Sequence, residues 1–318
     1  MSDSFSKYFS GSYYLIDQSS TRVTVSQSNL CIYSCFFQSI SNSAVYYNGA
    51  TMNMLIGSSV FHSCFSSGHG GGIYFNCAAG SSVLYNVCGY NCYSTLTSVS
   101  DGQLARMSTG TTSKNFLHYV SVRSCPLSEG SNRYNPVSIL QGYQQVNNNN
   151  FTKNKCVRIS SFQSVSSNTF NSVYCTIVGN SVTDGQILNC HSGVSRVLQY
   201  SNFINNTSPN AGVIFIWESA ALTIEFSVFS GNSNILFYVG SGSLTVRHSF
   251  IKHTSTLKSG SLVTSNITAL TSTYLIHHYA TNMCETPYYP TSTYVKTAGK
   301  PDLRIGTIVL LYLIFYII

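Results

Sequence analysis

Charged residues are scarce in this chain of 318 residues. Lys, Arg, Asp and Glu together make up 8% of the sequence, about a third of the share usual in soluble proteins. Low charge combined with 13% aromatic residues excludes an intrinsically disordered chain. The net charge of +7 is thinly spread, and its densest cluster is Lys153, Lys155 and Arg158. This distribution favours a few solvated charges at a rim and predicts no nucleic-acid partner.

Acidic residues are especially few, nine in total. Glycoside hydrolysis needs two carboxylates held across a sugar linkage, and the closest pair in the central sequence, Glu218 and Glu225, is expected on different strands. The chain has neither the Asp clusters of a calcium-dependent lyase nor a Gly-x-Ser-x-Gly nucleophile motif. We therefore expect no catalytic residue and no cofactor. A polysaccharide-processing enzyme, a lyase or hydrolase, is the rival function.

Helix signals are nearly missing, and short strand signals dominate. Runs of β-branched and aromatic residues at 45–47, 73–75, 213–217 and 235–239 are bounded by Gly, Ser and Asn, as strands between tight turns are. About three such runs fit between successive copies of a recurrent motif. The motif is a hydrophobic residue followed three positions later by Asn or Cys. Its members are Ile32-x-x-Cys35, Phe61-x-x-Cys64, Val122-x-x-Cys125, Phe151-x-x-Asn154, Ile177-x-x-Asn180, Phe203-x-x-Asn206 and Phe229-x-x-Asn232, with Gly89-x-x-Cys92 and Phe250-x-x-His253 as weaker copies.

The mean spacing of the motif, about 27 residues, is typical of a repeat architecture in which each unit buries its apolar face against its neighbours. Three short strands per period leave no room for a helix. The sequence therefore predicts an all-β, right-handed parallel β-helix of about ten coils. A leucine-rich repeat is less well supported, because its Leu-x-x-Leu-x-Leu frame is missing.

In such a fold, equivalent side chains stack one coil apart, about 4.8 Å from each other. We expect one interior ladder of hydrophobic side chains and, three positions later, a ladder of Cys and then Asn. The hydrophobic ladder contains Phe61, Phe151, Phe203, Phe229 and Phe250. The second ladder contains Cys35, Cys64, Cys92, Cys125, Asn154, Asn180, Asn206 and Asn232.

The chain has eleven cysteines, an odd number. No two Cys pairs have the spacing of a zinc site. Cysteines stacked about 4.8 Å apart exceed the 3.5–4.5 Å between Cβ atoms that a disulfide needs. We therefore expect buried free thiols, no metal site and no disulfide.

Four segments are predicted. Residues 1–28 form a cap or lead-in, 29–283 the β-helix, 284–304 a stalk with three prolines, and 305–318 a membrane-anchoring segment that is almost wholly apolar. As a helix, the last segment spans about 21 Å against a hydrocarbon core of about 30 Å, so Lys300 and Arg304 would extend toward the lipid headgroups. The alternatives are a buried terminal strand, a core helix or a lipid-anchor signal.

The side of the membrane that the β-helix faces is argued from conflicting features. The first ten residues contain no apolar run of a secretory signal, and Lys296, Lys300 and Arg304 favour a cytosolic domain. Long domains nevertheless cross membranes largely regardless of flanking charge. Four Asn-x-Ser/Thr sequons, at Asn150, Asn205, Asn206 and Asn266, are candidate glycosylation sites. We expect a location at the cell surface.

The motifs also carry a resemblance. Phe151–Asn154, Phe203–Asn206 and Phe229–Asn232, together with Gly70-Gly-Gly-Ile73 and Ala211-Gly-Val-Ile214, resemble the Phe-x-x-Asn and Gly-Gly-Ala-Ile repeats of the chlamydial polymorphic membrane protein adhesins. The chain is similar, too, to the repeat surface proteins of trichomonads. We expect no C-terminal β-barrel translocator of the kind that the chlamydial proteins carry.

The resemblance implies a surface protein that presents a repetitive face for adhesion or recognition of host-cell or glycan ligands. Such a face would use exposed aromatic side chains on the strands. The candidates are Tyr46, Tyr47, Tyr74, Trp217 and Tyr238. A further alternative is a non-functional fragment of an expanded repeat family.

Overall fold

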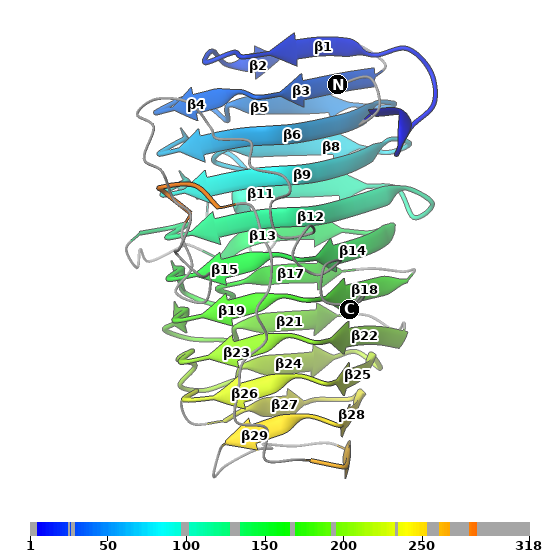
Figure 1. Cartoon of the computed structure of the whole chain (residues 1–318), viewed down its shortest axis with the longest axis vertical. Helices are drawn as coiled ribbons and strands as arrows, with labels where there is room; N and C mark the ends of the chain where they lie inside the picture. The colour runs from blue at the N-terminus through cyan, green and yellow to red at the C-terminus, as the bar shows by residue number, and fades with distance from the viewer. Residues whose placement is uncertain are drawn as a thin grey trace, which may run out of the picture.

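The computed structural model describes residues 5–24, 26, 29–96, 102–127, 134–165, 169–191, 195–232, 235–252, 261–267 and 280–284. Over these ranges the chain is a parallel β-solenoid with almost no helix, which confirms the predicted all-β fold. It has about eight turns where the motif count predicts about ten. Figure 1 shows the strands stacked along the long axis in chain order. The right-handed sense of the coil stays a prediction.

The strands form two large parallel sheets of 17 and nine strands, and two small sheets of two strands each. The 17-stranded sheet contains β1 (Tyr14–Asp17), β3 (Asn29–Tyr33), β4 (Phe36–Gln38), β6 (Asn53–His62), β9 (Ser81–Tyr90), β12 (Lys114–Arg123), β14 (Tyr143–Asn147), β15 (Asn150–Thr152), β18 (Phe170–Val173), β19 (Thr176–Val178), β22 (Ser195–Gln199), β23 (Asn202–Ile204), β25 (Ala221–Glu225), β26 (Val228–Ser230), β28 (Ser243–Arg247), β29 (Phe250–Lys252) and β30 (Ser261–Ser265).

The nine-stranded sheet faces it across the core. It contains β2 (Val23–Thr24), β5 (Val45–Gly49), β8 (Ile73–Cys77), β11 (Gly102–Thr109), β13 (Asn135–Leu140), β17 (Phe162–Val165), β21 (Leu188–His191), β24 (Ile214–Trp217) and β27 (Phe237–Val239). The small sheets pair β7 (Phe65–Ser66) with β10 (Tyr93–Ser94), and β16 (Lys155–Cys156) with β20 (Ser181–Val182). The strand runs expected at 213–217 and 235–239 contain β24 and β27, which pair in parallel on adjacent coils.

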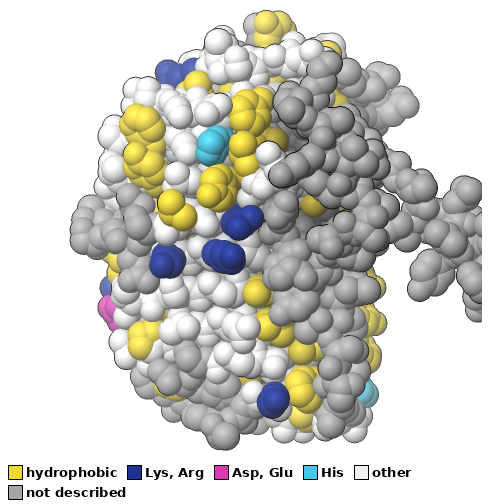
Figure 2. Space-filling view, turned by 60° about the vertical axis from the view of Figure 1, so that its left-hand side comes forward, with side chains coloured by type: hydrophobic (Ala, Val, Ile, Leu, Met, Phe, Trp, Pro, Cys, Tyr) yellow, Lys and Arg dark blue, Asp and Glu magenta, His cyan; other side chains and the backbone are white. Residues whose placement is uncertain are grey.

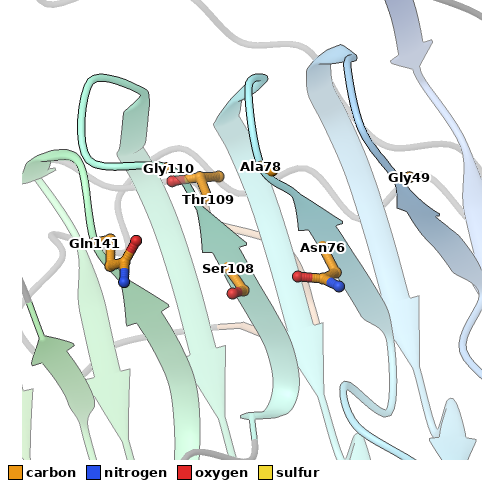
Figure 3. Close-up of a pocket in the computed structure, with 7 residues that line it drawn as sticks. All are labelled: Gly49, Asn76, Ala78, Ser108, Thr109, Gly110 and Gln141. Atoms are coloured by element: carbon orange, nitrogen blue, oxygen red, sulfur yellow. The ribbon is translucent and has the colours of Figure 1, made fainter.

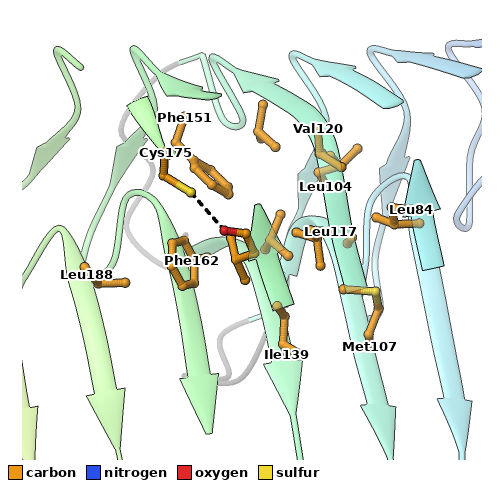
Figure 4. Packing of buried hydrophobic residues seen from close by; sticks show 14 of the residues in the cluster. Leu84, Leu104, Met107, Leu117, Val120, Ile139, Phe151, Phe162, Cys175 and Leu188 are labelled. Carbon is orange, nitrogen blue, oxygen red and sulfur yellow. Dashed lines mark hydrogen bonds between the residues drawn. The ribbon is translucent and has the colours of Figure 1, made fainter. Parts of the chain in front are cut away.

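Alternation along each strand separates the core from the surface. In β24, Ile214 and Ile216 are fully buried, whereas Phe215 and Trp217 point outward. Repeated coil after coil, this pattern builds one continuous hydrophobic core between the sheets. Figure 4 shows part of this core, with Met107, Leu117 and Phe162 among the side chains that fill it. The core is therefore a packed interior that leaves the outer faces of the sheets for function.

One core ladder follows the hydrophobic position of the motif. Its members, in register one coil apart, are Phe37, Phe61, Gly89, Val122, Phe151, Ile177, Phe203, Phe229 and Ile251. The rings of Phe203 and Phe229 stack with centroids 4.8 Å apart. At Gly89 the Leu104 side chain fills the gap, since a Cβ there would lie 2.3 Å from Leu104 Cδ2.

The assignment of Phe250 to this ladder is wrong. Phe250 is in register with Val228, and its neighbour Ile251 is in register with Phe229. The coil at this point is 22 residues long, so aligning phenylalanine with phenylalanine shifts the register by one residue. A shift by one moves a side chain to the opposite face of the strand. Phe250 accordingly packs on the outside with Val178, Ile204 and Val228.

Two corners of the coil repeat an αL residue, with φ near +55°, at every turn of the solenoid. A non-glycine residue in this conformation is disfavoured by about 1–2 kcal/mol, so the repetition indicates a fixed turn geometry. The first corner contains Ser34, Ser58, Asn86, Tyr119, Asn148, Tyr174, Tyr200, Phe226 and His248. The second contains Ser39, Ser63, Asn91, Ser124, Lys153, Gly179, Asn205 and Gly231.

The solenoid begins inside the segment predicted to be a cap. β1 already pairs with β3 and β2 with β5, so Tyr14 marks the first coil. Phe5, Phe9 and Tyr13 pack against Leu55 and Val83 on the outside of the large sheet.

A disulfide between Cys88 and Cys284 corrects the expectation that no cysteine is paired. Cys88 lies on the outer face of β9, in register with Val60 and Ser121, so the distance argument about interior stacks does not apply to it. The segment 280–284 lies on this outer face, where Arg123 Nη1 donates to the Met283 carbonyl at 3.4 Å (orange in Figure 1). The other nine cysteines are free and buried.

Candidate recognition surface

The asparagine ladder is a continuous chain of hydrogen bonds inside the second corner. Asn206 Oδ1 accepts from the amide N–H and from Nδ2 of Asn180, both at 3.1 Å. Asn206 Nδ2 donates to Ile177 O and to Asn232 Oδ1. Asn154 and Asn180 are joined in the same way. Because every buried amide group has partners, this ladder stabilises the corner and offers no free group to a ligand.

Cysteine replaces asparagine in the first coils of the same ladder. The amide N–H of Cys92 donates to Cys125 Sγ at 3.2 Å, and Cys64 Sγ donates to Phe37 O at 3.5 Å. Cys125 N–H in turn donates to Asn154 Oδ1 at 2.8 Å. Burial raises the pKa of the Cys92 thiol. Since the thiolate is the reactive form, Cys92 is a poor nucleophile.

Cys35 does not belong to this ladder. Its amide N–H donates to Ser59 Oγ at 3.2 Å, which places it in a second ladder at the first corner. The register Phe37–Phe61 makes Ile40 the equivalent of Cys64, so the Ile32-x-x-Cys35 motif marks the other corner. The polar members of the second ladder are Cys35, Ser59, Asn149, Cys175, Ser201, Ser227 and Ser249. Cys175 Sγ also donates to Val146 O at 3.1 Å, the dashed line in Figure 4.

The four sequons divide by burial. Asn150 and Asn206 are fully buried, and Asn206 is part of the hydrogen-bonded ladder. A glycan on either side chain is incompatible with this packing. Asn205 and Asn266 are exposed αL residues, so these two are the sequons that the fold leaves accessible.

Four of the five aromatic candidates lie on one surface. Tyr46, Tyr74 and Tyr238 share one outward row of the nine-stranded sheet, and Trp217 lies two residues along from that row. Tyr46 and Tyr74 stack with centroids 5.1 Å apart. Tyr47 instead points into the core, where its hydroxyl donates to Thr51 O at 3.0 Å. We call the outer side of this sheet the aromatic face.

The most exposed aromatic group on this face is centred on Trp217. Trp217 is 41% exposed, and its ring is nearly parallel to that of Phe215, with centroids 5.6 Å apart. Phe215 stacks in turn on Tyr238 of the next coil at 4.9 Å. Gly240 allows the indole to lie over the next strand, because a Cβ there would be 2.4 Å from Trp217 Cε3. The three rings thus form a stacked aromatic row across β24 and β27, with Gly240 against one part of the indole.

Polar groups border this aromatic row on the side of β21. His191 is in register with Trp217, and its Nε2 lies 3.3 Å from Glu218 Oε1. Both side chains are partly exposed. We call Trp217, Phe215, Tyr238, His191 and Glu218 the Trp217 site. It combines an apolar ring surface with a carboxylate and an imidazole, a set that can bind the C–H face and the hydroxyls of a sugar.

Phe215 and His191 were not among the candidates from sequence. Strand alternation was a usable signal for Phe215, because it stands between the two buried isoleucines of β24. His191 had no local signal, since it reaches Trp217 only through the register of β21 and β24.

A small polar pocket lies at one end of the aromatic face. Its lining comes from Gly49, Asn76, Ala78, Ser108, Thr109, Gly110 and Gln141 at the ends of successive strands (Figure 3). Its volume is about 260 Å³, below the ~300–1,000 Å³ of ordinary small-molecule sites. Asn76 Nδ2 already donates to Asn48 Oδ1 at 2.7 Å. The pocket is a weaker candidate than the Trp217 site.

Carboxylates are not paired in the part of the chain that the structure describes. Glu218 follows β24 of the nine-stranded sheet, whereas Glu225 lies on β25 of the other sheet. Glu225 accepts from Gln199 Nε2 at 2.6 Å and pairs with Arg247. The Gln199 hydrogen bond, helped by Arg247, lowers the pKa of Glu225, which fixes it as a structural anion. Among these residues, no three His, Cys, Asp or Glu side chains are placed to hold a metal ion.

Comparison with known proteins gives no relative. No family model, no curated protein and no solved structure matches this chain. The resemblance to the chlamydial and trichomonad surface proteins therefore rests on the short motifs alone. In the described ranges, no helix is long and apolar enough to cross a membrane. The predicted membrane segment, residues 305–318, lies outside those ranges, as do the stalk 284–304 beyond Cys284 and His253 of the weak motif.

Proposed function

We propose that this chain is a cell-surface recognition protein that binds carbohydrate at the Trp217 site. The observation that carries the proposal is the exposed Trp217 ring, held in a stacked aromatic row beside His191 and Glu218. Indole and phenol rings present large apolar surfaces that lose little conformational entropy on binding. A partly exposed tryptophan on a rigid sheet is therefore suited to contact the C–H face of a pyranose.

His191 and Glu218, which lie beside the aromatic rings, can form hydrogen bonds with sugar hydroxyls. Glu218 accepts hydrogen bonds, and His191 can donate or accept, so the pair can bind adjacent sugar hydroxyls at the edge of the ring. The proposed activity is binding without catalysis. Hydrolysis by either common mechanism needs a second carboxylate across the linkage, and Glu225, the nearest acid in sequence, lies on the other sheet.

The surface location is supported by the disulfide. Disulfides persist in oxidising compartments and are rare in the cytosol, and Cys88–Cys284 joins two fully buried residues. The exposed sequons Asn205 and Asn266 agree with passage through a secretory route. Anchoring through residues 305–318 is part of the same proposal.

Binding is tested with the purified, disulfide-bonded chain on an array of neutral and acidic glycans, followed by calorimetry on the best ligand. Trp217→Ala is expected to weaken binding at least tenfold. Tyr143→Ala is the matched control, because Tyr143 is similarly exposed, at 48%, but lies on the other sheet. It should change affinity less than twofold. Equal effects of the two variants, or no glycan bound, would refute the Trp217 site.

Location is tested in cells that express the tagged full chain. Carbonate washing should leave the protein in membranes, and deletion from Ile305 onward should release it. Protease added to intact cells should degrade the solenoid. If the solenoid is degraded only after detergent treatment, the domain is intracellular and the surface proposal is wrong.

A further inference from the structure

The second corner carries a group of cations that the Trp217 site does not involve. Arg123 ends β12, Lys153 is the αL residue after β15, and Lys155 begins β16. Arg123 is in register with Thr152, the neighbour of Lys153, so all three cations lie on two adjacent coils. Lys153 and Lys155 are exposed. We call these three residues the basic corner.

Figure 2 shows this edge of the solenoid, with Lys and Arg side chains gathered below a group of hydrophobic side chains and a histidine. The edge is built from two outward rows that flank the Cys and Asn ladder. One row runs His62, Tyr90, Arg123 and Thr152, and the other begins with Phe65 and Tyr93. Aromatic coils thus precede basic coils along the same edge.

The backbone fixes where the cations stand. Lys153 N–H donates to Val178 O at 3.1 Å and Lys155 N–H to Pro126 O at 3.4 Å. The guanidinium of Arg123 lies over the Tyr90 ring at 5.9 Å and also donates to Met283 O. Arg123 therefore contacts the segment 280–284, which the Cys88–Cys284 disulfide attaches to β9.

The part of the chain that the structure describes places no acidic partner on the three cations. In the described residues, none of the three cations forms an ion pair; the ion pairs seen there involve Glu218 and Glu225 elsewhere. The two rows contain no acidic residue at the positions described. Like charges held close together on a rigid scaffold raise the local concentration of an anionic ligand.

We infer that the basic corner binds an acidic saccharide, a chain whose sugars carry sulfate or carboxylate groups. Coils repeat about every 4.8 Å, so cations on adjacent coils can meet anionic groups on neighbouring sugars. Arg123 can bind a sulfate or carboxylate through two parallel N–H bonds, whereas each lysine supplies a point charge. The phenol edge of Tyr90 offers hydrogen bonds to sugar hydroxyls next to the cations.

The aromatic geometry favours a saccharide over a single-stranded nucleic acid. Base binding uses free ring faces on which bases stack. Here the ring faces cover each other: Phe65 stacks on Tyr93 at 5.6 Å, His62 contacts Tyr90 at 5.5 Å, and Arg123 lies over Tyr90. The cations of the basic corner and the hydroxyl-bearing edge of Tyr90 are then the groups that a ligand can contact, and this combination suits an anionic sugar.

The test uses the full chain with its disulfide intact, titrated with heparin and with chemically desulfated heparin at physiological salt. The double variant Lys153→Ala, Lys155→Ala is compared with Lys7→Ala, Lys114→Ala. The control pair is also exposed and removes the same net charge from other positions. Arg123 is left in place because it contacts Met283 and Tyr90. Circular dichroism and thermal melting verify that each variant is folded.

Heparin should bind, and the corner variant should lose at least tenfold in affinity while the control pair loses less than twofold. The dependence of log affinity on log salt should be less steep for the corner variant than for the control pair, because fewer counterions are released on binding. Trp217→Ala should leave heparin binding unchanged, so this result is independent of the proposed function. Equal losses in both double variants, equal affinity for desulfated heparin, tighter binding of single-stranded DNA, or no binding would each overturn the inference.

Discussion

The amide N–H of Asn180 donates to the side-chain Oδ1 of Asn206, 3.1 Å away and one coil further along the solenoid. The same bond in the first coils runs from Cys92 to Cys125, with sulfur as the acceptor. An amide and a thiol therefore serve the same corner. Each asparagine side chain accepts from the preceding coil and donates back to it, so the ladder joins coils through side chains in addition to the sheet hydrogen bonds.

This equivalence predicts unequal effects of two substitutions at Asn206. Asn206→Ala leaves the buried backbone N–H of Asn180 without its acceptor, removes one hydrogen bond to the Ile177 carbonyl, and should lower the free energy of unfolding by about 1–3 kcal/mol. Asn206→Cys should have a smaller effect, because cysteine already occupies this place at Cys92 and Cys125. Urea unfolding of both variants measures the difference. Equal loss in the two variants would contradict the role assigned to the thiol.

The phenylalanine ladder predicts a contrast between two positions with the same side chain. Phe203 is fully buried on the core ladder, whereas Phe250 is half-buried on the outer surface. Phe203→Ala should lower the free energy of unfolding by about 3–5 kcal/mol. Phe250→Ala should lower it by less than half as much. A larger effect at Phe250 would mean that the register assigned to β29 is wrong.

The cysteine pairing predicts a definite alkylation pattern. Denatured protein treated with iodoacetamide should gain nine adducts before reduction and eleven after it, since nine of the eleven cysteines are free. Cys88→Ser, Cys284→Ser should lower stability by about 2–5 kcal/mol, the usual effect of losing a native disulfide. Peptide mapping without reduction identifies the pair, and a bond between any other two cysteines would refute the assignment.

Two partly buried histidines predict acid sensitivity. Burial lowers the pKa of both His69 and His118 from 6.5 to about 4, with Arg106 and Lys7 as the secondary causes. Between pH 6.5 and 4 the unfolded chain therefore binds protons that the folded chain does not, and stability falls as the pH falls.

His118→Gln should reduce this loss between pH 7 and pH 5 by about 1–2 kcal/mol. Urea midpoints of the variant and the parent at the two pH values give the comparison. An unchanged pH dependence would show that His118 does not contribute.

Gly240 predicts a way to disturb the Trp217 site without removing a ring. Gly240→Ala places a methyl group on the indole, 2.4 Å from Cε3, and the ring must move. Because Trp217 is the only tryptophan, its fluorescence reports the site directly. We expect a shifted emission maximum, an unchanged circular dichroism spectrum and weaker glycan binding. Gly68→Ala, where the nearest atom would be 3.6 Å away, should leave the emission unchanged.

The sequence predicted the fold because one corner of the coil repeats a recognisable motif. Phe203 and Asn206 recur as Phe229 and Asn232 at a constant 26 residues, and that constancy indicates a solenoid. The ladder positions predicted from the motif were wrong where the coils change length, as at Phe250 and Cys35. The ladder at the first corner was not predicted, because its positions hold Ser, Cys, Asn and Val and no single residue type recurs there.

The candidate sites were less predictable, since they depend on contacts between distant residues. Trp217 was a candidate through its strand, but its partner His191 is brought to it only by the pairing of β21 with β24. The bond from Cys88 to Cys284 spans 196 residues, and no local spacing indicates it. The alternation of residues along a strand predicts on which face of the sheet a side chain lies. Its neighbours on that face depend on the register between paired strands.

The disulfide also determines how the solenoid responds to mechanical load. A pull on the chain beyond Cys284 reaches β9 through the covalent bond to Cys88. All the coils from β10 to β30 lie inside the closed covalent loop, so tension cannot peel them away one at a time from the last coil. A recognition protein tethered in this way would keep the Trp217 site and the basic corner folded while its attachment is under strain.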